Sequence, residues 1–154
     1  MAGGEEPDST PLSPDEEDLW RAFARVLNAL PRVLDTGLQA TANITAAEYV
    51  ALASLADARP EGLRIGDLAS RVGLSPSRVS RLADSLVRRG EAHRDRGADD
   101  GRSAQLTITE AGLARVEAAW PHQVANVREH VMRHLDPADN AALTRALRSI
   151  ADNL

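Results

Sequence analysis

The sequence contains no cysteine and no lysine. Without cysteine, the chain can form neither a disulfide framework nor a thiol-based redox sensor. It has no apolar run near the roughly 18 residues of a membrane span, and no basic-then-apolar segment opens it. We therefore expect a soluble, cytoplasmic protein that does not bind membranes. With 154 residues, the chain is long enough for one domain with a modest core.

The common signatures of enzymes are missing as well. The sequence has no HExxH zinc motif, no P-loop, no glycine-rich dinucleotide loop and no ordered serine–histidine–aspartate set. His122 and His130 share one face of a predicted helix, but no carboxylate–histidine cluster with metal spacing accompanies them. We expect no catalytic residues, no metal and no cofactor.

The charges are unevenly distributed along the chain. Residues 64–102 hold nine arginines and six acids, a local charge of +3, whereas the remainder holds nine arginines and seventeen acids, a charge of −8. Arginine favours bidentate contacts with phosphate and guanine, although biased base composition of the coding DNA would equally explain the absence of lysine. Residues 1–18 contain seven acids, no base and three prolines, which predicts a disordered acidic tail.

The basic segment has the helix start and stop signals of a helix-turn-helix. A short helix is predicted at Gly66–Val72, and Gly73 ends it because glycine accepts a positive φ without strain. Ser75 suits the N-cap of a second helix, Pro76 suits its first position, and Gly90 suits its C′ position.

The second helix has two different faces. Its apolar residues recur at the spacing of a buried stripe: Val79, Leu82, Ala83, Leu86 and Val87. The opposite face offers hydroxyl and guanidinium groups, which hydrogen-bond to base edges and phosphates in a major groove. The candidate DNA contacts around this helix are Ser75, Ser77, Arg78, Ser80, Arg81 and Arg88.

A basic hairpin follows. Residues 91–96 and 103–109 flank a glycine-containing connection, and the second arm alternates with Ala104, Leu106 and Ile108 on one side. Arg94, Arg96 and Arg102 are predicted to meet the phosphate backbone or enter a minor groove. The alternative is a solvated hairpin whose arginines pair with Asp95, Asp99 and Asp100.

Residues 68–90 and 99–112 together resemble the MarR-type family of winged helix-turn-helix transcription regulators. The family's wing carries an Asp-x-Arg pattern, here Asp100-Gly101-Arg102, before an alternating strand that ends in a Leu-Thr-x-x-Gly pattern, here Ile108 to Gly112. The resemblance covers about residues 19–154. It departs from the family at residues 91–93, where an aliphatic residue is usual, and at Gly101, where a second basic residue is common. It implies a mainly α fold with a small antiparallel β-wing.

The flanking segments predict further helices. An amphipathic helix kinked by Pro31 is expected from Leu19, Thr45 to Glu48 is a capping box for a helix to Asp57, and residues 63–65 suit a third strand. Thr109 can cap a long helix through Leu135, bent at Pro121, and Asp136 can cap a last helix. These terminal helices carry more apolar surface than one lobe can cover, which predicts a homodimer.

The predicted organisation is therefore a dimerisation region made of residues 19–44 and 110–154, and a DNA-binding lobe made of residues 45–109. The resemblance also implies a pocket between these parts, often for phenolic or other aromatic acids. Trp20, Arg25, Tyr49 and His93 are the ligand candidates, although core packing explains a residue such as Trp20 more simply. Arg32, Trp120, His122 and His130 have suitable chemistry too.

The favoured function is a homodimeric regulator that binds an inverted repeat in double-stranded DNA, as a repressor released by a small anionic aromatic effector. The main alternative is a winged-helix module that binds protein without reading DNA sequence. Asp84, an acid on the predicted recognition face, is the one residue that favours this alternative.

Overall fold

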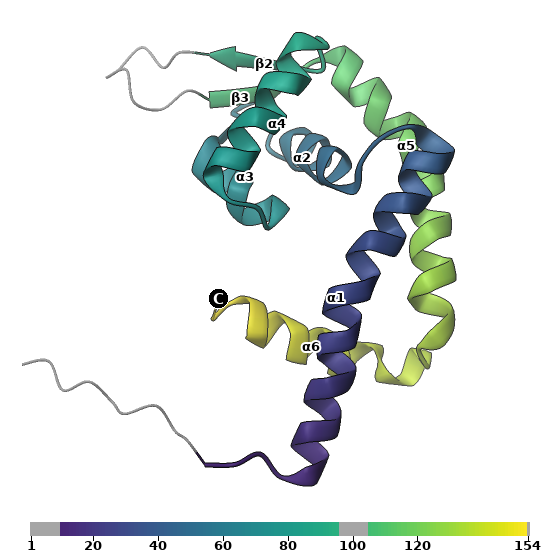
Figure 1. The fold of residues 1–154 in the computed structure, drawn as a ribbon. Coiled ribbons are helices and arrows are strands. Elements are labelled where there is room, and N and C mark those ends of the chain that lie inside the picture. The colour runs from purple at the N-terminus through teal and green to yellow at the C-terminus, as the bar shows by residue number, and fades with distance from the viewer. Residues whose placement is uncertain (1–9, 96–104, 154) are drawn as a thin grey trace, which may run out of the picture.

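The computed structural model describes residues 10–95 and 105–153, which are mostly helical with a small antiparallel sheet (Figure 1). This confirms the predicted fold class. In chain order the elements are α1 (Pro14–Ala42), α2 (Ala46–Asp57), β1 (Leu63–Arg64), α3 (Ile65–Val72), α4 (Pro76–Arg88), β2 (Ala92–Asp95), β3 (Gln105–Ile108), α5 (Glu110–His130), the 3-10 turns η1 (Met132–His134) and η2 (Pro137–Asp139), and α6 (Asn140–Ala151).

The sheet has the strand order β1-β3-β2. Leu63 lies opposite Leu106, and Ala92 lies opposite Ile108, in two antiparallel pairings. The predicted hairpin and third strand are both present, except that Ile65 already belongs to α3. The helix-turn-helix prediction is also confirmed, since Gly73 and Gly90 follow α3 and α4 with φ values of 71° and 72°.

Helix α1 begins earlier than predicted. Ser13 and Glu16 form a capping box, in which the Glu16 carboxylate accepts from the Ser13 amide at 2.8 Å. Residues 14–18 are therefore helical, which corrects the predicted tail of residues 1–18; residues 1–9 lie outside the described part. The cause is local, because this reciprocal pair satisfies two amides that would otherwise lack partners. Pro31 lies within this helix, which continues from Pro14 to Ala42.

Helix α5 begins as predicted, with the Thr109 side chain accepting from the Gly112 amide, but it ends at His130 rather than Leu135. Asp136 caps η2 instead of α6, accepting from the Ala138 amide at 2.9 Å. A proline disfavours helical backbone at the residue before it. Asp136, which precedes Pro137, is accordingly extended with a ψ of 129°. The chain therefore turns before α6 starts.

Helices α1 and α5 lie side by side along the length of the molecule, with α6 near the first half of α1 and the lobe of α2, α3, α4 and the sheet at the other end (Figure 1). The largest fully buried side chains are Leu38, Ile44, Leu52, Leu55, Leu68, Val79, Leu86 and Leu106. Most of these belong to the lobe, whereas α6 contributes no buried residue. The core thus anchors α4, and α6 has an uncovered apolar face.

Candidate nucleic-acid interface

Helix α4 is held in the lobe by one face. Val79, Ala83 and Leu86 are fully buried, as the spacing predicted. Ser77, Arg78, Arg81 and Arg88 are exposed on the other side, and Ser80 is half-buried at the edge. Among the described residues, the three arginines of this set have no ion-pair partner. The helix therefore presents unpaired guanidinium groups to solvent on a rigid support.

Ser75 occupies the N-cap position of α4, but its side chain does not cap the helix. Its hydroxyl lies 3.2 Å from the Ser77 hydroxyl instead. This corrects the expectation of a side-chain cap. Two exposed hydroxyl groups therefore sit together at the start of α4, where amides and the helix dipole favour an anion such as a phosphate.

Arg94 on β2 does not point away from the protein. Its guanidinium lies 2.9 Å from the Asp84 carboxylate on α4 rather than beside Asp95. Asp99 and Asp100, the other acids that the alternative named, lie outside the described residues. Its position opposite Leu106 explains this, because residues directly opposite in an antiparallel pair share one face of the sheet. The sequence contained a signal for this: Arg94 is two residues after Ala92, and residues two apart on a strand point to the same face of the sheet. Arg96 and Arg102 lie outside the described residues.

The junction between α4, the wing and α5 is closely packed. The Thr109 hydroxyl donates to the Gly90 carbonyl at 2.6 Å, and the Thr109 amide donates to the Glu91 carbonyl at 3.2 Å. A Cβ at Gly112 would lie 2.1 Å from that same Glu91 carbonyl. The pattern from Thr109 to Gly112 therefore has a structural role. It lets α5 start directly against the end of α4, the predicted recognition helix.

The four ligand candidates do not converge within one chain. Trp20 is 56% exposed and packs its ring 6.4 Å from that of Phe23, while His93 pairs with Asp95 on the wing at 3.2 Å. Arg25 borders a groove between α1 and α6. Tyr49 is buried on α2, where burial and then the charge of Asp57 raise the pKa of its hydroxyl.

Tyr49 borders a cavity of about 330 Å³ between α2 and α5. The other lining residues are Trp120, Gln123, Val124, Val127, Arg128 and Met132. The carbonyl oxygen of the Gln123 side chain is buried there and has no hydrogen-bond partner in the part of the chain that the structure describes. Trp120 was a sequence candidate, whereas Gln123 and Arg128 were missed because nothing in the sequence places them beside Tyr49.

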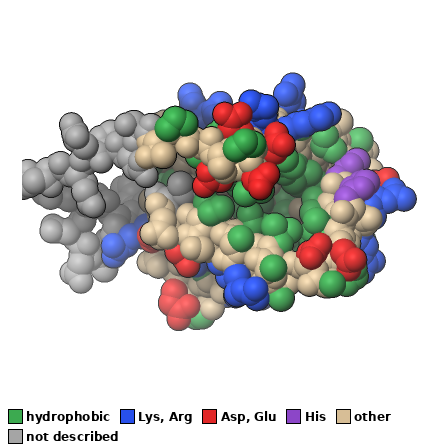
Figure 2. All heavy atoms as spheres, turned by 90° about the horizontal axis from the view of Figure 1, so that it is seen from below, with side chains coloured by type: hydrophobic (Ala, Val, Ile, Leu, Met, Phe, Trp, Pro, Cys, Tyr) green, Lys and Arg blue, Asp and Glu red, His purple; other side chains and the backbone are tan. Residues whose placement is uncertain are grey.

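A second hollow lies between α1, η1 and α6, with a volume of about 600 Å³. Its lining is mainly apolar and includes Phe23, Val26, Leu30, Val33, Leu143 and Leu147. Figure 2 views the molecule from below and shows hydrophobic side chains gathered in a hollow. Among the described residues there is no helix long and apolar enough to cross a membrane, and no group of three or more acids or histidines placed to hold a metal.

Comparison with known proteins places this arrangement in a family. Residues 42–103 match the model of the MarR family. AbsC from Streptomyces coelicolor, a MarR family transcriptional regulator, is 30% identical, with 94% of this chain and 97% of AbsC covered at a TM-score of 0.81. Sco3205 from the same organism, solved in complex with DNA, is 26% identical, with 97% and 93% covered at a TM-score of 0.86.

CouR from Rhodococcus jostii RHA1, solved with p-coumaroyl-CoA, shares the fold at 23% identity, with 88% of this chain and 93% of CouR covered at a TM-score of 0.73. No curated protein matches the sequence. The family model, the identity to AbsC over nearly the whole of both chains, and the winged helix-turn-helix itself agree. The chain belongs to the MarR family of transcriptional regulators.

Proposed function

We propose that this regulator is a sequence-specific repressor that binds double-stranded DNA as a homodimer in the cytoplasm, without catalytic activity, metal or cofactor. The observation that carries the proposal is the exposed face of α4, where Ser77, Arg78, Arg81 and Arg88 project from a helix whose other face is buried. Guanidinium and hydroxyl groups on such a helix suit base edges and phosphates in a major groove. Sco3205, which was solved with DNA, has the same fold.

The protein-interaction alternative loses its main support in this structure. Asp84 was the one acid on the recognition face, and the Arg94 guanidinium lies 2.9 Å from its carboxylate. The pair neutralises the negative charge that would repel a phosphate. The face as a whole is therefore cationic, which favours DNA over a protein partner.

The proposed occupant of the apolar hollow is a second copy of this chain. Leu27 on α1 and Leu147 and Ile150 on α6 are 53%, 43% and 45% exposed, and α6 buries no residue in the single chain. An exposed apolar face of this kind marks an interaction site, and a two-fold dimer lets the same face cover itself. We assign residues 19–44 and 110–154 to this dimerisation region and residues 45–109 to the DNA-binding lobe. Two lobes related by a two-fold axis would read an inverted repeat.

The cavity beside Tyr49 is the proposed effector site, for a small anionic aromatic compound. Trp120 offers a ring face, Arg128 offers a cation, and the unpaired Gln123 side-chain oxygen can accept a hydrogen bond. Its walls come from α2 in the lobe and α5 in the dimerisation region. A ligand there can favour one spacing of the lobes, because only differential affinity shifts an equilibrium. CouR, of the same fold, was solved with an aromatic acyl thioester.

A gel shift across a range of salt concentrations, with DNA from upstream of the protein's own gene, tests this function. We expect retardation at nanomolar protein that persists in excess unrelated DNA. Equal binding to unrelated DNA, or no binding, would contradict the proposal. Aromatic carboxylates that raise the melting temperature should release the DNA in the same assay. If stabilising compounds leave DNA affinity unchanged, the effector site is wrong but the DNA-binding proposal stands.

A further inference from the structure

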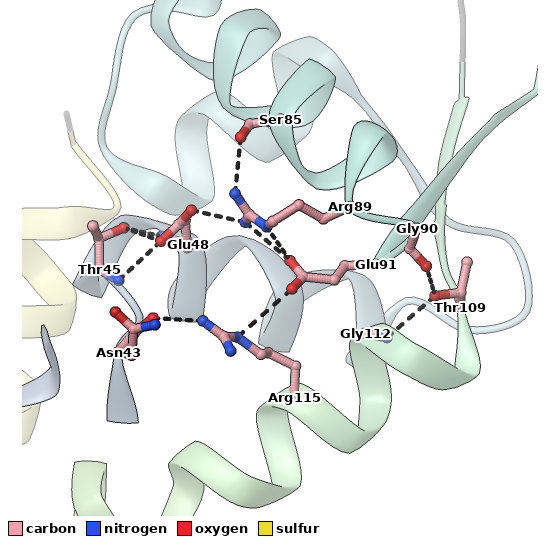
Figure 3. Close-up of polar contacts among 10 residues, drawn as sticks. All are labelled: Asn43, Thr45, Glu48, Ser85, Arg89, Gly90, Glu91, Thr109, Gly112 and Arg115. Carbon is pink, nitrogen blue, oxygen red and sulfur yellow. Dashed lines mark hydrogen bonds and ion pairs between the residues drawn. The ribbon is translucent and has the colours of Figure 1, made fainter. Parts of the chain in front are cut away.

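Four charged side chains meet where the recognition helix ends (Figure 3). Glu48 lies at the start of α2, Arg89 directly follows α4, Glu91 precedes β2, and Arg115 lies on α5. Their ion pairs form a chain: Arg89 pairs with both Glu48 and Glu91, and Glu91 also pairs with Arg115. The cluster thus joins the junction between α4 and β2 to two helices that are far from it in the sequence, α2 and α5.

Each of the three nitrogens of the Arg89 guanidinium donates to another side chain of the same chain. Nε donates to Glu91 at 3.0 Å, Nη1 donates to the Ser85 hydroxyl at 2.8 Å, and Nη2 donates to Glu48 at 2.8 Å. Its neighbour Arg88 has no such partner among the described residues. Arg89 differs from Arg78, Arg81 and Arg88 in its pairing rather than in burial. Its side chain is 37% exposed, but its cation is already paired with two carboxylates.

Glu91 is the centre of the cluster and is only 8% exposed. One carboxylate oxygen binds Arg89, and the other lies 3.6 Å from Arg115 Nε. Arg115 also donates through Nη2 to the carbonyl of Asn43, the residue that caps the C-terminus of α1. A charge buried this deeply is tolerated only when it is paired. Arg89 supplies the hydrogen-bonded cation, and Arg115 supplies a second cation at the longer distance.

Glu48 connects the cluster to the turn between α1 and α2. Its other carboxylate oxygen accepts from the amide and the hydroxyl of Thr45, both at 2.9 Å. Partial burial alone would raise the pKa of Glu48, but the Thr45 hydrogen bonds and the charge of Arg89 together outweigh it and hold that pKa below its ordinary value. The turn itself is attached to α1, since Asp35 accepts from the Ala46 amide at 2.8 Å.

We propose that Arg89, Glu91 and Arg115 are positioning residues for DNA binding: their contacts set the angle of the recognition helix relative to α1 and α5, without touching DNA. The contacts form a closed path from Asn43 through Arg115, Glu91, Arg89 and Glu48 to Thr45, two residues beyond its start. Every link in the path is a hydrogen bond except the one between Arg115 and Glu91. There Arg115 Nε lies 3.6 Å from the carboxylate and makes no hydrogen bond among the described residues, so the two charges form an ion pair only. The end of α4 is therefore tied to the turn that follows α1, and a displacement of α1 or α5 would be transmitted to the recognition helix.

This inference rests on the proposed DNA binding. The variant Arg115→Gln tests the positioning role, because Arg115 lies on α5 and not on the face of α4 that would contact DNA. We expect this variant to dimerise as the wild type does and to bind the operator roughly 3- to 30-fold more weakly. The slope of log affinity against log salt should stay unchanged, because no phosphate contact is lost. Arg133→Gln makes the same charge change at an exposed ion pair with Glu129 and should bind like the wild type.

Arg89 provides a second, independent arm. If Arg89 bound a phosphate, Arg89→Lys would keep most of the affinity and Arg89→Gln would lower the salt slope. In the proposed role, lysine cannot reproduce three diverging hydrogen bonds, so both variants should weaken binding with the wild-type slope. Arg88→Gln, beside it, should lower both affinity and slope. Circular dichroism melting identifies any unfolded variant, and Arg115→Lys then replaces Arg115→Gln.

Two outcomes would overturn the inference separately from the function. If the wild type binds its operator and folded Arg115→Gln binds equally well, the positioning role is wrong while DNA binding stands. The same holds if Arg89→Gln lowers the salt slope as Arg88→Gln does, since Arg89 would then be a phosphate contact. If the wild type retards no DNA, both the function and this inference are wrong.

Discussion

Gly37 on α1 lies directly against Asn126 on α5: a Cβ at Gly37 would lie 2.5 Å from Asn126 Oδ1. The side-chain Nδ2 of Asn126 donates to the Leu34 carbonyl at 2.8 Å, and Asn126 is only 9% exposed. The absence of a side chain at Gly37 thus makes room for a buried interhelical hydrogen bond.

The variant Gly37→Ala should displace the Asn126 side chain and lower the free energy of unfolding by about 1–3 kcal/mol, measured by urea denaturation. Gly66→Ala is the matched control, because a Cβ there meets nothing within 4 Å; it should change stability by less than about 1 kcal/mol, in the stabilising direction. In the double variant Gly37→Ala/Asn126→Ala, the cost should fall below the sum of the single costs. Simple additivity would mean that the two residues do not compete for space.

The variant Leu147→Glu should convert a dimer into a single chain. Leu147 is 43% exposed in the monomer, so a carboxylate there costs little until a second chain covers it. Light scattering should give about twice the 16.5 kDa chain mass for the wild type and the single mass for the variant. Ser149→Glu places the same charge on the other side of α6 and should remain dimeric. A wild type of single-chain mass at micromolar concentration would contradict the dimer.

Arg81 and Arg102 should contribute to DNA binding in different ways. Arg81→Ala should cost about 1–3 kcal/mol on the preferred sequence and relax its preference, as expected for a base-edge contact. Arg102, which lies outside the described residues, is predicted to contact the backbone or minor groove. Arg102→Ala should therefore weaken binding to all sequences and reduce the salt slope by about one per half-site. An unchanged slope and unchanged nonspecific affinity would refute the wing assignment.

Glu48 should make stability depend on pH in the acid range. Its folded-state pKa lies below the ordinary value of 4.5, so folding favours the carboxylate; the stabilisation is present above that value and is lost as pH falls through the folded pKa. Glu48→Gln should cost about 1 kcal/mol at pH 7, and the gap to the wild type should close below pH 4.5. Glu61→Gln, at an exposed position, should show no such gap. A constant difference across pH would contradict this role for the carboxylate.

The elements of this fold were predictable where their signals are local. Thr45 and Glu48 are three residues apart, and the glycines after α3 and α4 act on their own backbone. The same logic applied to Ser13 and Glu16 would have placed the start of α1 correctly, since that capping box has the same spacing. The end of α5 was misplaced because Val131 and Leu135 continue the apolar pattern, although they line the groove beside α6 rather than extend the helix.

By itself, the sequence determined the winged helix-turn-helix, the cationic face of α4 and the apolar surplus of the terminal helices, because periodicity and capping act over a few residues. Only the tertiary structure decided which charged side chains are paired within the chain and which are left for a partner. Arg89 meets Glu48 across 41 positions, Arg115 meets Asn43 across 72, and Asn126 meets Leu34 across 92. Such contacts depend on how whole helices pack. No short-range pattern distinguishes Arg89, whose charge is paired with Glu48 and Glu91, from Arg88 beside it, which has no ion-pair partner among the described residues.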